Sequence, residues 1–241
     1  MTDPVRTPWR DSISSLRGGV VVSCQVASGS PLDQPSFIAA LAQSGERGGA
    51  VGFRVNGPAN TGAVRAVSDL PIIGIRKVLQ PDGGIVITPT LDDALTVVDA
   101  GASIVALDAT KGRHAGLALA GIVDALHVRG IGVMADIATA AEAGDALAAG
   151  VDLVATTLAG YTPTTSHLDP GEPAFDLLRE IRDLPVPVVV EGRIWTFEHV
   201  ARCFDGGAYA VVIGSAITAP EQITRRFVAA VPGKGDGAPR G

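Results

Sequence analysis

The stretch VPVVVEGRIWT, residues 186–196, decides the fold of this chain. Its run of β-branched apolar residues, bounded by proline and glycine, predicts a strand that is buried on both faces, as strands in parallel sheets are. Charged side chains follow at once in EGR, residues 191–193, and burying charge is costly unless it is paired or used. A second apolar run, AYAVVIGSAI at 208–217, ends in Gly214-Ser215. Two such neighbours are typical of the last two strands of a (β/α)8 barrel, where phosphate commonly binds.

Two interpretations of Glu191 and Arg193 are open from this stretch alone. In the first, both side chains stand at the carboxyl end of a strand and contact a substrate. In the second, they form a structural ion pair with each other, because ion-pair networks resemble functional sites.

The rest of the chain alternates strand and helix patterns. We expect six earlier strands, at 20–26, 50–55, 71–78, 103–110, 131–138 and 152–162, and a short extended piece at 85–88. We expect helices at 36–43, 61–67, 91–100, 117–128, 140–149, 174–182, 196–204 and 220–231. Eight such units in strict alternation predict an α/β fold with a parallel sheet. A doubly wound sheet would need a glycine-rich phosphate fingerprint after the first strand, and SCQVASGSP at 23–31 does not supply one. We therefore predict a (β/α)8 TIM barrel.

The 241 residues suit one domain of this kind. We expect an N-terminal extension at 1–19 with a short helix at 11–16, the catalytic barrel at 20–231, and a tail at 232–241 that is disordered by composition.

Composition and charge exclude several functional classes. The net charge is −6 and no basic stripe is present, which argues against binding to nucleic acid. No apolar run reaches the roughly 18 residues of a membrane span, and the N-terminus has no signal-peptide core. Two cysteines without metal-type spacing suit a reduced compartment, so we expect a cytoplasmic protein.

Polar side chains occur at the carboxyl end of every predicted strand, and these ends converge on one face of a barrel, where active sites lie. They are Gln25, Arg54, Lys77, Asp108, Asp136, Thr157, Glu191 and Ser215. A polar group at one strand end can be a satisfied core residue, whereas a complete ring predicts an active site.

The composition of the ring limits its chemistry. It contains no imidazole, because His114, His127, His167 and His199 fall in loops or helices. Asp108 and Asp136 could hold a divalent metal, but the cations Arg54, Lys77 and Lys111 would repel it, so we expect neither metal nor cofactor. No serine or cysteine is paired with a histidine, and strand alternation directs Cys24 away from the face that carries Gln25, into the core.

After these exclusions the ring still contains a lysine, Lys77, and a carboxylate, Glu191, and such a pair suits general acid–base proton transfer. To act as a base, Lys77 needs a pKa lowered by burial or by Arg54 and Arg76, while Glu191 opposes that shift. Phosphate binding or a Schiff base are the other roles open to Lys77.

Nine segments in register resemble the N-acylmannosamine-6-phosphate 2-epimerase family, also called N-acylglucosamine-6-phosphate 2-epimerase. They are SCQ (23–25), AVGFRVNG (50–57), PIIGIRK (71–77), ITPT (87–90), ALDAT (106–110), MADIAT (134–139), TTLAGYTP (156–163), VEGRIWT (190–196) and GSAIT (214–218). The resemblance spans roughly 20–228. It implies a TIM barrel that interconverts the two amino sugar phosphates by inversion at C2, an isomerase of sialic acid catabolism with no organic cofactor or metal.

The resemblance also implies roles for individual residues. Lys77 and Glu191 match the catalytic pair, and we expect Lys77 to handle the C2 proton while Glu191 assists ring opening or proton return. The positions that hold the sugar are Gln25, Arg54, Asp136 and, more weakly matched, Tyr161. The backbone around Gly192, Arg193, Gly214 and Ser215 matches the phosphate cradle.

The chain departs from the family pattern at two positions. Ala219 stands where an arginine usually follows GSAIT, and Arg76 stands where the family often has an apolar residue. Two alternatives therefore stay open: an isomerase or lyase acting on another sugar phosphate, and a non-catalytic barrel that binds a sugar phosphate. A homodimer is also plausible, because the N-terminal segment could pack on a partner.

Overall fold

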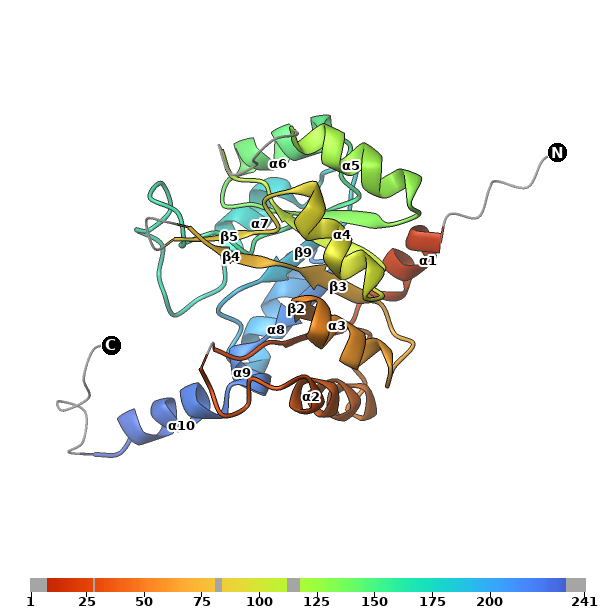
Figure 1. The fold of residues 1–241 in the computed structure, drawn as a ribbon. Coiled ribbons are helices and arrows are strands. Elements are labelled where there is room, and N and C mark those ends of the chain that lie inside the picture. The colour runs from red at the N-terminus through yellow and green to blue at the C-terminus, as the bar shows by residue number, and fades with distance from the viewer. Residues whose placement is uncertain (1–7, 28, 81–83, 112–117, 233–241) are drawn as a thin grey trace.

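Figure 1 shows a closed barrel surrounded by helices in the computed structural model, which describes residues 8–27, 29–80, 84–111 and 118–232. Within these residues, the barrel strands are β1 (Val20–Cys24), β2 (Gly52–Asn56), β3 (Ile72–Ile75), β6 (Ile104–Asp108), β7 (Gly132–Asp136), β8 (Leu153–Ala155), β9 (Val188–Glu191) and β10 (Ala210–Ile213). Their order around the barrel is β1-β10-β9-β8-β7-β6-β3-β2, and the paired strands are parallel. The predicted (β/α)8 barrel is confirmed.

Helices follow the strands along the chain. They are α2 (Pro35–Arg47), α3 (Pro58–Arg65), α4 (Leu91–Asp99), α5 (Leu119–Val128), α6 (Ala140–Ala148), α7 (Phe175–Ile181), α8 (Phe197–Asp205), the short α9 (Ser215–Thr218) and α10 (Pro220–Ala229). The hydroxyl of Thr90 accepts the Asp93 N–H at 3.1 Å and caps α4. None of the described helices has the length and apolar character that a membrane crossing requires.

The N-terminal extension closes one end of the barrel. Helix α1 (Pro8–Ser15) begins three residues before the expected 11–16 and packs against β6 and β7. The indole of Trp9 donates to Asp152 Oδ1 at 3.1 Å and stacks on the His127 ring. Leu16, which follows the helix, is fully buried with the side chains that fill the barrel interior. The described part of the extension therefore packs on its own barrel.

The predicted strand 71–78 divides into two elements at Arg76. Strand β3 ends at Ile75, and β4 (Lys77–Leu79) pairs antiparallel with β5 (Ile85–Ile87) in a separate hairpin. Thr88 turns the chain here, because its N–H donates to the Arg76 carbonyl at 2.7 Å and its hydroxyl accepts the Arg76 N–H at 3.0 Å. The prediction of one continuous strand at 71–78 was wrong, because the backbone N–H and carbonyl of Arg76 bond to Thr88, the residue after β5. Figure 1 shows this hairpin on the far side of the barrel from α1.

Other expected boundaries also shift. The strand expected at 152–162 ends at Ala155, and a turn-rich loop follows it. Helix α3 begins at Pro58 rather than residue 61, because proline is favoured in the first helical turn. The strand expected at 208–217 gives way to α9 after Gly214. Residue 117, the expected start of the helix at 117–128, and the tail from 233 onwards lie outside the described residues.

Ile13 and Leu16 are buried with the side chains of the barrel interior, and we call these two residues the plug. Truncation of the plug should lower the stability of the fold without changing the structure at the opposite end of the barrel. We expect Leu16→Ala to lower the free energy of unfolding by about 2–5 kcal/mol, because it removes a fully buried side chain from a packed interior. Urea titration followed by circular dichroism measures this. Val128→Ala, at a side chain that is 88% exposed, is the matched control, and an equal loss in both variants would contradict the role of the plug.

Candidate active site

A cavity of about 610 Å³ opens at the end of the barrel opposite α1, within the size range of small-molecule sites. Most of the residues that the sequence nominated line it: Gln25, Lys77, Thr157, Tyr161, Glu191, Gly192, Arg193, Gly214 and Ser215. They come from the carboxyl ends of strands and from the loops that follow, so the expected convergence on one face is observed.

Arg54 and Asp136 lie beneath the floor of this cavity. Their side chains are 1% and 0% exposed. The guanidinium of Arg54 donates from Nη1 to Asp136 Oδ1 at 3.0 Å and from Nη2 to Oδ2 at 2.6 Å. The same Nη1 lies 2.8 Å from Glu191 Oε2. One buried cation thus bridges two carboxylates from different strands.

Glu191 stands at the boundary between this buried group and the cavity, with 13% of its side chain exposed. Burial raises its pKa to about 7, and the nearby Asp136 carboxylate acts in the same direction. Arg54 is the strongest opposing influence, followed by Lys77 and the Thr157 hydroxyl. The Thr157 hydroxyl lies 2.6 Å from Asp136 Oδ1 and 3.3 Å from Glu191 Oε2. The carboxyl group can therefore both accept and donate a proton near neutral pH.

Lys77 is held at the cavity by the start of the hairpin. Its N–H donates to Asn56 Oδ1 at 2.9 Å, which joins the end of β2 to the first residue of β4. The residue is open to solvent, yet protein atoms around the amino group desolvate it and lower its pKa; Arg54 adds to this shift while Glu191 and Asp136 oppose it. Arg76 takes no part, because its Nε is directed towards Asp93 Oδ1 at 3.9 Å. The expected influence of Arg76 on Lys77 was therefore wrong, and that of Arg54 was right.

Gln25 lines the cavity and carries an acceptor that no described residue uses. Its Nε2 donates to Ser23 Oγ at 2.7 Å, while Oε1 is buried without a partner among the described residues. A buried acceptor of this kind is normally satisfied, so it invites a donor from a ligand. The neighbouring Cys24 is fully buried on the other face of the strand, and burial raises its pKa to about 12. The expected core position of Cys24 is confirmed.

The Arg193 side chain turns away from Glu191. Its Nε donates to the Glu172 carbonyl at 2.6 Å and its Nη1 to the Ala159 carbonyl at 2.7 Å. The guanidinium also lies over the Tyr161 ring at 5.6 Å. An ion pair between Glu191 and Arg193 was therefore wrong, since Glu191 pairs with Arg54 instead. Arg193 fixes the loop beside the cavity.

Comparisons with known proteins agree with this geometry. The model of a family described as "Putative N-acetylmannosamine-6-phosphate epimerase" matches residues 38–233. The chain belongs to this epimerase family. A relative from Caldanaerobacter subterraneus named "Putative N-acetylmannosamine-6-phosphate 2-epimerase" is 41% identical, and the match covers 90% of this chain and 93% of the relative. A relative of the same name from Thermosynechococcus vestitus is 42% identical over 92% of this chain and 97% of its own.

A solved structure extends the likeness to three dimensions. The N-acetylmannosamine-6-phosphate 2-epimerase from Clostridium perfringens superposes with a TM-score of 0.84 at 39% identity, covering 89% of this chain and 94% of that one. The resemblance to the epimerase family that the nine segments indicated is confirmed.

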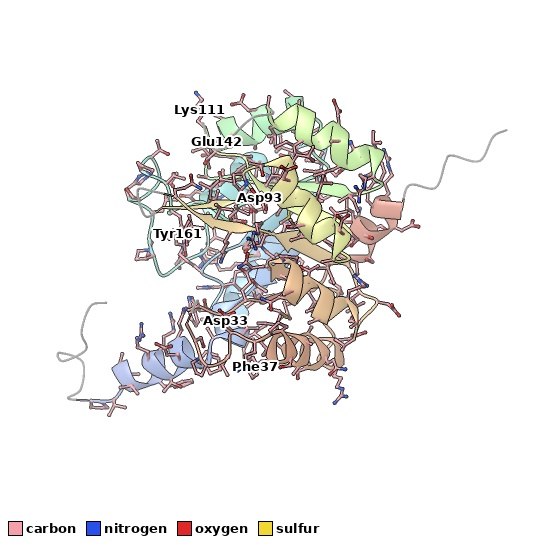
Figure 2. All side chains as sticks on the ribbon, in the orientation of Figure 1. Asp33, Phe37, Asp93, Lys111, Glu142 and Tyr161 are labelled. Carbon is pink, nitrogen blue, oxygen red and sulfur yellow. The ribbon has the colours of Figure 1, made fainter. Side chains whose placement is uncertain are left out.

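Two further polar residues considered from the sequence, Asp108 of the ring and Lys111 beyond it, do not line the epimerase-family cavity. Asp108 accepts from the Thr110 N–H at 3.0 Å and from its hydroxyl, and it is not among the residues that line the cavity. Lys111 is exposed, and Figure 2 shows it at the edge of the molecule, well separated from Tyr161. Within the described residues, no group of three or more histidine, cysteine, aspartate or glutamate side chains has a metal-binding arrangement.

Several cavity residues were not nominated from the sequence. Trp195, Gln222 and Arg226 line it from the loop after β9 and from α10. Asn56 orients the backbone of Lys77 from the end of β2. The sequence indicated only that Asn56, together with Gly57, ends the strand expected at 50–55. Nothing in the sequence of α10 indicated that this helix would reach the cavity.

The Glu191 carboxyl group should titrate near pH 7. We expect this midpoint in ¹³C NMR of protein labelled at the glutamate carboxyl, with the resonance assigned by its loss in Glu191→Gln. Its pKa is raised from the ordinary 4.5, so the folded chain binds more protons here than the unfolded chain between these values. The contribution of Glu191 to stability is consequently present below about pH 4.5 and lost as the pH rises through about 7.

The cause of the shift can be checked with Asp136→Asn. Removal of this neighbouring negative charge should move the Glu191 midpoint downwards, because Asp136 raises the pKa of Glu191. A wild-type midpoint near 4.5, or an unchanged midpoint in the variant, would contradict the electrostatic description.

Proposed function

We propose that this chain interconverts N-acylmannosamine 6-phosphate and N-acylglucosamine 6-phosphate by moving the proton at C2, without a cofactor. Membership of the epimerase family supports the reaction. The observation that carries the proposal is the position of Lys77 and Glu191, which face one cavity with pKa values shifted towards neutrality. Two groups in that condition suit exchange of a proton with carbon.

Chemistry fixes what the two groups must do. The C2 proton becomes acidic only after the sugar ring opens and C1 becomes an aldehyde. The neutral amine of Lys77 then takes the proton, which leaves an enolate with its charge on O1. The protonated carboxyl of Glu191 returns a proton to the opposite face of C2, so the centre is inverted. The ammonium of Lys77, formed in the first step, stabilises the anion at O1.

Arg54 and Asp136 serve the reaction through Glu191 rather than through the sugar. Their side chains are 1% and 0% exposed and lie below the cavity, out of reach of a bound sugar. Arg54 fixes the Glu191 carboxylate at 2.8 Å, and Asp136 accepts one N–H from each terminal nitrogen of the guanidinium, while Nε has no partner among the described residues. Their role is therefore to position Glu191 and to set its proton affinity.

The residues that line the cavity divide between the sugar and its phosphate. Gln25 Oε1 accepts from the acylamino group or a hydroxyl, and Tyr161, held over Arg193, borders the entrance. Gly192, with φ of 105°, and Gly214 with Ser215 present backbone to the phosphate. Arg193 contributes its backbone here, because its side chain bonds to two carbonyl groups.

The biological setting follows from this substrate. We place the enzyme in the cytoplasm and in amino sugar catabolism, which includes the breakdown of sialic acid. Two cysteines, Cys24 and Cys203, are both free and buried, as suits a reduced compartment.

Proton NMR of N-acetylmannosamine 6-phosphate in deuterated water tests the reaction. We expect the gluco epimer to form with deuterium at C2 in the absence of added metal. Lys77→Ala and Glu191→Gln should each lower the rate by about 10²–10⁴-fold, the usual size of an acid–base contribution. Lys111→Ala, at an exposed lysine away from the cavity, should retain the wild-type rate.

Each alternative gives a different result. Exchange at C2 without the epimer would show that proton removal survives while return to the other face fails. Neither exchange nor epimer would exclude this substrate and favour another sugar phosphate or a binding role.

We also propose that the chain forms a homodimer through α10. Helix α1 of the N-terminal segment packs on its own barrel, so a different surface is needed for association. Helix α10 extends away from the barrel (Figure 1) and leaves Phe227 74%, Val228 50% and Val231 44% exposed around its end. Apolar surface grouped in this way usually marks a contact with another protein.

Light scattering coupled to gel filtration checks the assembly. We expect a dimer for the wild type and a monomer for Phe227→Asp, which places a charge in the contact. Val128→Asp changes an exposed apolar residue on α5 and should remain dimeric. A monomeric wild type would exclude the proposal.

A further inference from the structure

The end of the cavity assigned to phosphate lacks a cation at Ala219. This residue lines the cavity beside Gly214 and Ser215, and its methyl group cannot pair with a dianion. The nearest arginine in the neighbouring loop, Arg193, donates its side-chain N–H groups to the Ala159 and Glu172 carbonyls. If this end of the cavity binds phosphate, a residue other than Ala219 and Arg193 must supply the positive charge.

Helix α10 supplies such a residue. It begins directly after Ala219, and Gln222 and Arg226 line the same cavity from its surface. Their separation of four residues places them on one face of the helix, in line with Ala219 three residues earlier. The Arg226 side chain therefore reaches the cavity from the helix that begins directly after Ala219.

A stacking contact holds Arg226 at this position. Its guanidinium carbon lies 4.1 Å from the centre of the Trp195 ring, and Trp195 itself lines the cavity. Stacking on an aromatic face leaves the N–H groups in the guanidinium plane available for an anion, in the geometry that suits phosphate. Trp195 follows Glu191 by four residues, so the loop that carries the acid also carries this platform.

The charge of Arg226 is not neutralised by a carboxylate within the described part of the chain. Its neighbour Arg225 differs, because Arg225 Nη2 pairs with Glu221 Oε1 at 2.8 Å along the helix. The two adjacent arginines are both exposed on α10, but only Arg226 lines the cavity.

We propose that Arg226, seated on Trp195, is the residue that binds the substrate phosphate and replaces the cation missing at Ala219. This proposal rests on the proposed function, because it assigns the specificity for a phosphorylated sugar within that same cavity. Arg226 acts on binding and takes no part in proton transfer at C2.

Arg226→Ala and Arg225→Ala form a matched pair for steady-state kinetics with N-acetylmannosamine 6-phosphate. Loss of one charge-assisted contact in Arg226→Ala should raise KM by about ten-fold, with kcat changed much less. Arg225→Ala should keep the wild-type KM. The slow conversion of unphosphorylated N-acetylmannosamine should be equal in all three proteins, because that sugar has nothing for Arg226 to bind.

A rescue experiment separates a binding role from a structural one. The double variant Ala219→Arg with Arg226→Ala restores a cation at the same end of the cavity from the preceding turn. We expect its KM to return towards the wild-type value. Equal KM values for Arg226→Ala and Arg225→Ala, or an Arg226→Ala defect that also affects the unphosphorylated sugar, would overturn the proposal.

Binding of inorganic phosphate distinguishes failure of this proposal from failure of the proposed function. If the wild type does not convert the sugar phosphate, the reaction is wrong, and titration calorimetry with phosphate still decides the site. Weaker binding to Arg226→Ala than to Arg225→Ala supports it, and equal binding overturns it.

Discussion

The fold and the site both depend on one buried guanidinium. Arg54 on β2 reaches across the barrel interior to Asp136 at the end of β7 and to Glu191 at the end of β9, strands that are not its neighbours. Burial lowers the pKa of Arg54, but the two carboxylates outweigh that effect and raise it. Removal of Arg54 would leave two carboxylates without their cation, and breaking a buried pair in this way typically costs about 3–5 kcal/mol, a large part of a domain's stability. The arrangement is therefore fixed by the folded state as a whole.

This group also determines the chemistry above it. Because Asp136 engages both terminal nitrogens of Arg54, the positive charge is shared, and it stabilises the Glu191 carboxylate less than an undivided cation would. Glu191 consequently keeps a pKa near 7 while it remains hydrogen-bonded in place. Lys77 lies on the open side of the same charges, where desolvation and Arg54 lower its pKa. A structural ion-pair network and an acid–base pair are thus parts of one electrostatic system.

Much of the fold and of the site could be predicted from the sequence. The spacing of apolar residues identifies the strands and helices, and a polar residue at the end of a strand is placed on one face of the barrel. Apolar strands that end in a polar residue gave the barrel and the face of the site, and nine of the residues nominated for it line one cavity. Pairing could not be predicted. Arg54 and Glu191 are far apart in the chain, so the nearby Arg193 was the plausible partner from sequence alone. The break at Arg76 was also hidden, because it depends on hydrogen bonds to Thr88, twelve residues later. The contribution of α10 depends on the direction in which a surface helix leaves the barrel, which no local pattern specifies.

The plug formed by Ile13 and Leu16 determines the order in which some contacts of the fold can form during synthesis. Gly18 donates to the Tyr209 carbonyl at 2.7 Å, the Tyr209 hydroxyl donates to the Ile13 carbonyl at 3.1 Å, and β1 pairs with β10. Ile13 and Tyr209 are 196 residues apart, so Ile13 finds this partner long after it has itself been synthesised. Contacts between such distant residues form slowly, and the apolar side chains of Ile13 and Leu16 stay unprotected until then. Helix α1 is thus complete well before β10, and the contact between Ile13 and Tyr209 is among the last that can form.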